Sequence, residues 1–320
     1  MVHIKRRQDN QKMNEILDLC NTLNKIIQEP LYHNFYNLTN KLKCNQTFAS
    51  IDLIEDSQIA IDEFESAEPL GKQGRSTLLI YGLLQSLFLQ QDGLYHLYKC
   101  VVDENINQKD FFDLFSFDKD IREVRNDIAG HPTNRKNSEF YFIAKGPISK
   151  DRFTYAGYTP TFRTVEVDLK TFIIKQLEFT RNVLQKVQED ISKKIEMKKG
   201  EHKSKLLKEM IVGADRNILF IYRGIRDEDR NFQGELGISG LKSAIDEIRE
   251  ELNKRYNQKL HIEISESFRL IDYIIHRFNH WWNEKTLLGN DDAEIFLDSL
   301  ENQLNRLKEM LLEVDKEFNE

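Results

Sequence analysis

The sequence has few of the residues that break helices or cross-link a chain. Its 320 residues include 14 glycines and 5 prolines, and so few helix breakers favour long α-helices. The three cysteines, Cys20, Cys44 and Cys100, are odd in number and contain no Cys-x-x-Cys pair, which argues against both a disulfide framework and a thiolate zinc site. We therefore expect an all-α protein from a reducing compartment.

Long apolar runs are also missing. No segment approaches the roughly 20 consecutive apolar residues of a membrane span, and the first residues contain no apolar stretch typical of a signal peptide. We expect a cytoplasmic protein without a membrane partner. The net charge of −7 means that any attraction to nucleic-acid phosphates has to come from a local cluster of cations. Non-specific coating of DNA is therefore not expected.

The chain is long enough for two domains of roughly 100–200 residues each. We expect N-terminal helices over residues 1–66, a main domain over 67–199 and a C-terminal helical region over 200–320. The first clear amphipathic stripe lies within residues 10–28, and helices are expected to continue to about Phe64. Its apolar positions recur at three- and four-residue steps: Met13, Ile16, Leu17, Cys20, Leu23 and Ile27.

A break rich in Gly and Pro at Glu68–Arg75 precedes the helix that we expect to be central. Ser76 is suited to cap this helix, which is predicted to run from about Thr77 to Cys100. Its apolar residues lie on more than one side. A helix of that kind belongs in the core.

The pattern changes from helical to alternating over residues 138–168. The period shortens from about 3.6 towards 2 in three segments rich in aromatic or β-branched residues, Phe140–Ile143, Phe153–Tyr155 and Phe162–Val167, with Gly and Pro between them. This pattern predicts a small β-hairpin or three-strand ribbon. A long helix without Gly or Pro is then expected over residues 169–199.

The second half contains a lysine-rich and a glycine-rich stretch. Lysines gather around Gly200, where a solvated helix end is favoured over an RNA-facing patch. Three glycines recur at three-residue steps within Asp227–Gly240, but their spacing matches neither a P-loop nor a dinucleotide fingerprint. We interpret that segment as a connector between helices. Three amphipathic helices are predicted after it: Leu241–Tyr256, Ile262–Leu288 and Ala293–Phe318.

The segment over residues 118–132 carries the residues that best indicate chemistry. It begins with acidic residues that suit a helix N-terminus, and it ends with a Gly and a Pro that suit a stop. Gly130 is expected to take the left-handed conformation that ends a helix. Arg125 and Asn126 then lie in the last turns, and His131 lies beyond the helix end.

This segment resembles the signature of the HEPN superfamily, an Arg that is often followed by Asn and, after a short spacer, by His. Arg125, Asn126 and His131 match the signature with five residues between Arg and His, and the string Arg-Asn-Asp-Ile-Ala-Gly-His-Pro-Thr is similar to that of a bacterial subgroup. Residues 81–92, Tyr-Gly-Leu-Leu-Gln-Ser-Leu-Phe-Leu-Gln-Gln-Asp, are similar to the same subgroup. The resemblance covers roughly residues 70–195.

The resemblance implies an all-α HEPN bundle with a small inserted β-ribbon. It also implies a metal-independent endoribonuclease of the toxin or phage-defence type, such as abortive infection, that uses no cofactor. RNA is then the substrate, two copies of the motif meet in a homodimer, and an antitoxin protein or RNA is a candidate partner. Some HEPN domains are inactive, so a non-catalytic RNA-binding or protein-interaction module is the alternative.

The side chains themselves suit the cleavage of RNA by its own 2′-hydroxyl. Histidine, with a reference pKa of about 6.5, exchanges protons near neutral pH, which suits His131. The guanidinium of Arg125 is able to stabilise charge on a pentavalent phosphorus. Asn126 is expected to orient the His ring or the phosphate. The other candidates are Gln91, Asp92 and Asp127 as supporting residues, and Arg122, Arg135 and Lys136 as RNA-binding cations.

Two other interpretations were weighed. Arg125 and His131 near a helix C-terminus also suit a purely structural cap that complements the helix dipole. Separately, Asp272, His276 and His280 lie at four-residue steps on one predicted helix face but lack a metal ligand from another element. We favour packing over metal binding for this second set and expect no metal site.

Overall fold

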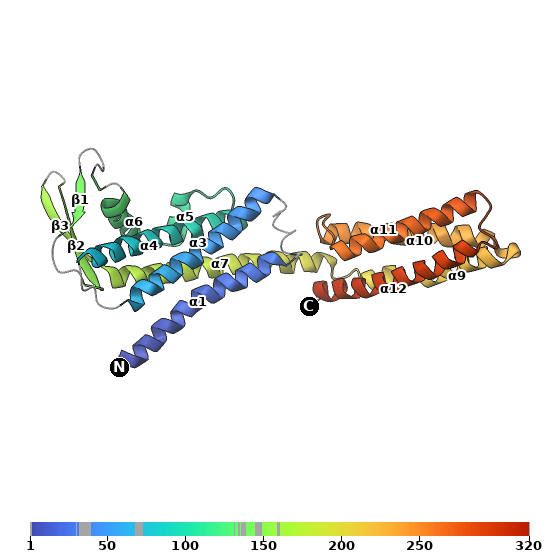
Figure 1. The fold of residues 1–320 in the computed structure, drawn as a ribbon, viewed down its shortest axis with the longest axis horizontal. Coiled ribbons are helices and arrows are strands. Elements are labelled where there is room, and N and C mark those ends of the chain that lie inside the picture. Colours follow the sequence, from blue (N-terminus) through green and yellow to red (C-terminus); the bar gives the residue numbers. More distant parts are fainter. Residues whose placement is uncertain are drawn as a thin grey trace. The chain divides into compact units, whose positions relative to one another are not determined.

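The computed structural model describes residues 2–29, 31, 40–67, 73–130, 132–133, 135, 139–144, 149–158 and 161–319. The chain divides into two compact units, the first formed by residues 1–29 and 36–193 and the second by residues 30–35 and 194–320. Both are built mainly from helices, and the first also contains a small antiparallel sheet (Figure 1). The predicted all-α class with a small ribbon is confirmed.

The helices of the first unit pack around α4. They are α1 (Val2–Gln28), α3 (Lys41–Ser66), α4 (Gln73–Val101), α5 (Gln108–Leu114), α6 (Lys119–Arg125), the π-helical turn η1 (Asn126–Gly130) and α7 (Leu169–His202), whose last residues belong to the second unit. α4 contacts α3 and α6, and buried hydrogen bonds join it to α7. Five of its leucines are almost fully buried: Leu83, Leu84, Leu87, Leu94 and Leu97. This helix is therefore central to the core, as predicted.

Two helix boundaries differ from the predicted ones. α4 begins at Gln73, and Ser76, predicted as its cap, is buried inside the helix. α7 begins at Leu169, as predicted, but continues through Gly200 to His202. A Cβ at Gly200 would meet no atom within 4 Å. This glycine lowers helix propensity without ending the helix.

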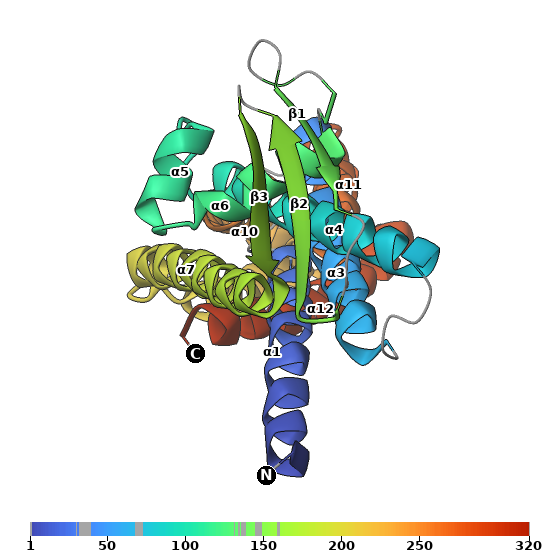
Figure 2. The same cartoon turned by 90° about the vertical axis from the view of Figure 1, so that its left-hand side faces the viewer.

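The predicted ribbon is a three-stranded antiparallel sheet in the order β1-β2-β3 (Figure 2). β1 (Phe140–Ile143), β2 (Arg152–Tyr158) and β3 (Phe162–Asp168) occupy the predicted segments. The side chains of one face are buried: Tyr141, Phe153, Tyr155 and Val167. The alternating pattern located the strands correctly because successive side chains in a strand point to opposite faces.

The second unit contains a bundle of four long helices. Its elements after α7 are α8 (Leu207–Met210), α9 (Ala214–Arg226), the 3₁₀ turn η2 (Glu228–Arg230), α10 (Phe232–Arg255), α11 (Ile262–Asn283) and α12 (Asp291–Asn319). α9 and α11 each contact both α10 and α12. The three predicted helices are confirmed, although α10 starts earlier and α11 ends earlier than expected. None of the helices in the described part of the chain is both long and apolar enough to cross a membrane.

The prediction of a connector over Asp227–Gly240 is wrong, because its three glycines lie inside α10, which begins at Phe232. These glycines allow a close crossing with α9. A Cβ at Gly237, for example, would lie 2.5 Å from the backbone oxygen of Asn217. Glycines at three-residue steps indicate a helix crossing here, since that spacing keeps them near one face of a helix.

Gly237→Ala is expected to destabilise the protein by about 1–3 kcal/mol, because the added methyl group meets backbone that has to shift. The measurement is the free energy of unfolding from urea denaturation, followed by circular dichroism. Gly200→Ala is the matched control, since a Cβ there meets open space and alanine stabilises a helix interior by roughly 1 kcal/mol relative to glycine. Similar effects of the two substitutions would contradict the close crossing.

A buried ionic cluster joins α8, α10 and α12. Arg255 on α10 is 2% exposed and donates to Asp315 on α12 at 3.1 Å. Asp315 also accepts the backbone N–H groups of Leu207 and Lys208, both at 2.9 Å, and so caps the start of α8. Buried charges are tolerated when opposite charges and hydrogen bonds compensate them, as they do here.

Glu251 extends this cluster to α7. Its carboxylate lies 2.8 Å from Nδ1 of His202 and accepts from Lys205 at 2.9 Å. Burial raises the pKa of Glu251, but the hydrogen bonds and charges of Lys205 and His202 outweigh burial and lower the pKa to about 2. The ionised form of Glu251 is therefore favoured in the folded protein.

Glu251 is expected to make stability fall in acid. Because its folded-state pKa lies below the ordinary value of 4.5, its stabilising contribution is fully present above about pH 4.5 and is lost as the pH falls from there towards 2. The measurement is the free energy of unfolding across this range for the wild type and Glu251→Gln. The variant should show a shallower loss. Parallel pH profiles would contradict this assignment.

Candidate active site

The Arg-Asn motif lies where α6 passes into the π-helical turn η1. The side chain of Asp118 accepts the backbone N–H of Asp120 at 3.0 Å and caps α6, as the acidic start of this segment predicts. α6 ends at Arg125, and η1 continues from Asn126 to Gly130. Single π-helical turns of this kind are frequent at functional sites.

Gly130 has a different role from the one predicted. It does not take a positive φ but belongs to η1. A Cβ at Gly130 would lie 2.9 Å from Nη1 of Arg125 and 3.2 Å from Oδ1 of Asn126. Glycine is therefore needed for the close approach of these two side chains and not for a left-handed backbone.

If this site cleaves RNA, as the HEPN resemblance implies, Gly130→Ala is expected to lower cleavage by about 10–100-fold, because the methyl group displaces the guanidinium of Arg125 from its position. Stability should change little, since the displaced atom is the end of a flexible side chain. The measurements are the cleavage rate and the free energy of unfolding. Gly213→Ala is the control, since a Cβ there meets nothing within 4 Å. Wild-type cleavage by Gly130→Ala would contradict the need for this close approach.

Arg125 is half-buried and is held by uncharged groups. Its Nε and Nη2 donate to Oε1 of Gln85 on α4 at 3.2 and 3.0 Å, and its Nη1 donates to Oδ1 of Asn126 at 3.0 Å. Its guanidinium carbon lies 3.9 Å from the centre of the Phe88 ring, a cation–π contact. Among the residues that the structure describes, no carboxylate forms an ion pair with Arg125.

Arg122, one turn earlier on α6, does have a carboxylate partner. It donates to Asp92 at 3.1 Å and to Oε1 of Gln91 at 3.3 Å. Its guanidinium carbon lies 4.1 Å from the centre of the Phe88 ring, which Arg125 also contacts. The structure thus brings the predicted residues Gln91 and Asp92 next to the Arg-Asn motif.

Arg135, predicted as an RNA-binding cation, is held by two carboxylates instead. It forms ion pairs with Asp127 and Glu123, and its side chain is 10% exposed. Tyr155 on β2 donates to the other oxygen of Asp127 at 3.0 Å. Asp127 therefore joins η1 to the ribbon through Tyr155, and the charges of Asp127 and Arg135 compensate each other.

The electrostatic setting of Arg125 favours an anionic ligand. Burial lowers the pKa of Arg125 and the nearby charge of Arg122 lowers it further, whereas Asp92 raises it. Arginine remains protonated in proteins, so this guanidinium carries its charge in an unfavourable environment. A phosphate group would relieve that cost and match the paired N–H donors of the guanidinium.

Gln85 and Phe88 were not among the predicted site residues, although both lie in the stretch that resembles the HEPN subgroup. They precede Asp92 by seven and four residues, which places all three on one face of α4. Arg122 and Arg125, three residues apart, likewise share one face of α6. The matching spacing on the two helices is a signal that could have indicated this contact.

Two predicted residues, His131 and Lys136, lie outside the described residues. His131 follows Gly130 directly in the sequence. The roles of both residues remain predictions.

Two of the residues considered as a possible metal site, Asp272 and His280, form contacts with other side chains. Arg249 donates to both carboxylate oxygens of Asp272 at 2.8 Å, and Nε2 of His280 lies 3.2 Å from Glu284. Within the described ranges, no group of three or more His, Cys, Asp or Glu side chains is arranged to hold a metal ion. These contacts favour the interpretation of this helix face as structural.

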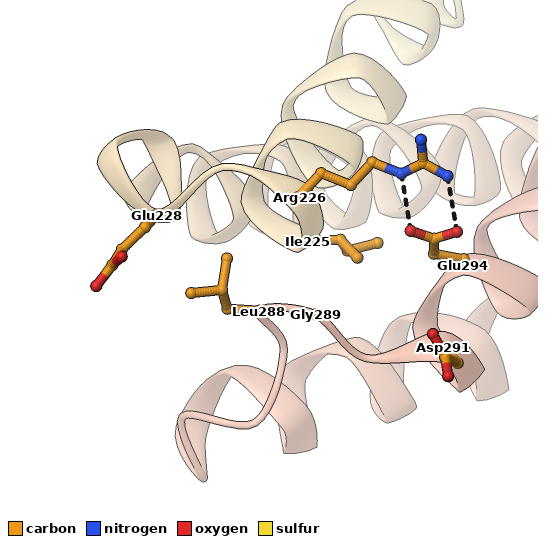
Figure 3. A pocket seen from close by; sticks show the side chains of 7 residues that line it. All are labelled: Ile225, Arg226, Glu228, Leu288, Gly289, Asp291 and Glu294. Atoms are coloured by element: carbon orange, nitrogen blue, oxygen red, sulfur yellow. Dashed lines mark hydrogen bonds and ion pairs between the residues drawn. The ribbon is translucent and has the colours of Figure 1, made fainter.

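The second unit has an open hollow of about 500 Å³ whose charges differ from those around Arg125 (Figure 3). Arg226 donates to both oxygens of Glu294 at 2.7 and 2.8 Å, and Glu228 and Asp291 also line the hollow. An arginine already neutralised among three carboxylates disfavours a phosphate ligand. We therefore place the candidate site at Arg125.

No protein-family model matches the chain, and neither the curated proteins nor the solved structures give a significant match to it.

Proposed function

We propose that the chain is a metal-independent endoribonuclease of the HEPN type, with Arg125, Asn126 and His131 as its catalytic residues. The observation that supports this proposal most is the state of Arg125. Its guanidinium is oriented by Gln85, Asn126 and Phe88. None of the carboxylates in the described part of the chain neutralises it. A charged and oriented guanidinium in a half-buried site suits the recognition of an RNA phosphate.

In the proposed reaction, the 2′-hydroxyl of one nucleotide attacks the adjacent phosphorus and the 5′-oxygen of the next nucleotide leaves. Neutral His131 accepts the proton of the 2′-hydroxyl, and a second acid gives a proton to the leaving oxygen. Arg125 stabilises the negative charge that develops on the pentavalent phosphorus, and Asn126 holds the guanidinium. The products are a 2′,3′-cyclic phosphate and a 5′-hydroxyl.

We further propose that two chains form a homodimer around the motif. The reaction uses both an acid and a base, whereas the motif supplies one His per chain. An isologous contact near Arg125 would place a second His131 in the same cleft. The HEPN resemblance also supports a cytoplasmic role in toxin action or phage defence, with an antitoxin protein or RNA as a candidate partner.

The test is incubation of the purified protein with mixed RNA in EDTA, alongside His131→Ala and a mass measurement by light scattering. Cleavage that persists in EDTA, disappears in His131→Ala and increases with dimer concentration is expected. Cleavage that chelation abolishes, or that His131→Ala retains, would overturn the metal-free assignment. Binding of RNA without turnover would favour the alternative, a non-catalytic RNA-binding module.

A further inference from the structure

A chain of buried hydrogen bonds runs from the core of the first unit to the Arg125 site. It crosses α3, α4, α7 and α6, and its five donor–acceptor distances lie between 2.7 and 3.3 Å. Each member donates to the next in this order: Arg122, Gln91, Gln176, Gln90, Gln58 and Asp62. All four glutamines are 0% exposed.

The two charged ends of this series of hydrogen bonds determine the direction in which its members donate. The guanidinium of Arg122 only donates hydrogen bonds, and the carboxylate of Asp62 only accepts them. Every glutamine between them therefore accepts with its oxygen and donates with its nitrogen in the same sense. A reversed amide would leave buried groups unsatisfied, which is costly. The series of hydrogen bonds thus has one favoured arrangement, in which the oxygen of Gln91 faces Arg122.

Arg122 in turn holds the carboxylate of Asp92. Asp92 is close enough to Arg125 to influence its ionisation, and both arginines contact the same Phe88 ring. If Arg122 moved away, the carboxylate of Asp92 would be left beside Arg125. No carboxylate among the residues that the structure describes forms an ion pair with Arg125. An ion pair between Asp92 and Arg125 would then compete with the phosphate.

We propose that Gln176 is a positioning residue of this site: through Gln91 it holds Arg122 on Asp92, and so keeps that carboxylate off Arg125. The inference rests on the proposed function of Arg125 as a phosphate ligand. It also gives Arg122 a different role from the predicted one, since Arg122 sequesters Asp92 and does not itself bind RNA.

The test uses the full-length protein and a fluorescein-labelled single-stranded RNA made of 2′-O-methyl nucleotides, which lacks the attacking hydroxyl. Fluorescence anisotropy gives the Kd. Gln176→Met is expected to weaken binding about tenfold, the order of one lost charge-assisted contact. Adding Asp92→Asn to Gln176→Met should restore most of the affinity. Asp92→Asn alone is the reference, and only a gain in affinity that is larger in the Gln176→Met background than in the wild type counts as restoration.

Arg122→Gln provides a second route to the same result. Arg122 is only half-buried, so this variant leaves the glutamines of the core in place if Gln176→Met fails to fold. It should weaken binding, and Asp92→Asn should again restore it. If the series of hydrogen bonds were purely structural, or if Arg122 contacted RNA directly, Asp92→Asn would not restore the RNA affinity.

Unchanged binding by both single variants, or losses that Asp92→Asn does not restore, would overturn the positioning role. A wild-type protein that binds the probe through Arg125 but leaves unmodified RNA intact would overturn only the proposed ribonuclease activity. A probe affinity that Arg125→Ala does not lower would overturn both proposals.

Discussion

Replacing Arg125 by alanine is expected to lower the rate of RNA cleavage by about 10²–10³-fold, because it removes the charge that stabilises the transition state. Arg125→Lys keeps the charge but loses the planar, paired donors that bind Gln85 and the phosphate, so it should recover little of the activity. The measurement is the single-turnover cleavage rate at saturating protein, with the free energy of unfolding recorded for each variant.

Arg226→Ala is the matched control for this prediction. Arg226 is also an arginine beside an aromatic ring, at 4.8 Å from Tyr222, but Glu294 neutralises it. Its removal should leave cleavage unchanged. Equal losses in Arg125→Ala and Arg226→Ala, or wild-type activity in Arg125→Ala, would show that the guanidinium of Arg125 has no special role.

Asp315→Ala should have the largest effect on stability, a loss of about 3–5 kcal/mol in the free energy of unfolding. The substitution leaves the buried guanidinium of Arg255 without this carboxylate and leaves the N–H groups of Leu207 and Lys208 uncapped. Urea denaturation followed by circular dichroism measures the loss.

The double variant Arg255→Met with Asp315→Leu tests the cause of that loss. It removes both charges and fills the space with apolar side chains, so no unpaired charge stays buried. It should be clearly more stable than Asp315→Ala. A double variant as unstable as Asp315→Ala, or a loss below about 1 kcal/mol for the single variant, would contradict the electrostatic explanation.

The local periodicity of apolar residues predicted most of the fold, because it reflects which side chains are buried. The alternation in Phe153–Tyr155 and Phe162–Val167 located β2 and β3, and the helical periodicity after Leu169 located α7. The glycines around Gly237 were wrongly predicted to lie in a connector because their role depends on α9, a separate helix. A sequence pattern alone does not distinguish a glycine that breaks a helix from one that allows another helix to pack closely against it.

The candidate site shows the same limit. The sequence predicted Asp92 as a supporting residue of the motif, and the structure places Asp92 beside Arg122. The predicted left-handed conformation of Gly130 was wrong, and the ion pair of Arg135 with Asp127 was not predicted, because spacing does not reveal the approach of Arg125 to the glycine or this pairing. The buried contact of Gln176 with Gln91 joins residues 85 positions apart, so no local motif indicates it.

The most direct test of the central claim, cleavage of RNA by its own 2′-hydroxyl with Arg125 and His131, is the chemical nature of the new RNA ends. RNA is incubated with wild-type protein in EDTA, and the fragments are analysed by mass spectrometry. We predict 2′,3′-cyclic phosphates paired with 5′-hydroxyls, and no such ends with Arg125→Ala or His131→Ala. Fragments with 3′-hydroxyls and 5′-phosphates, or identical fragments from all three proteins, would contradict it.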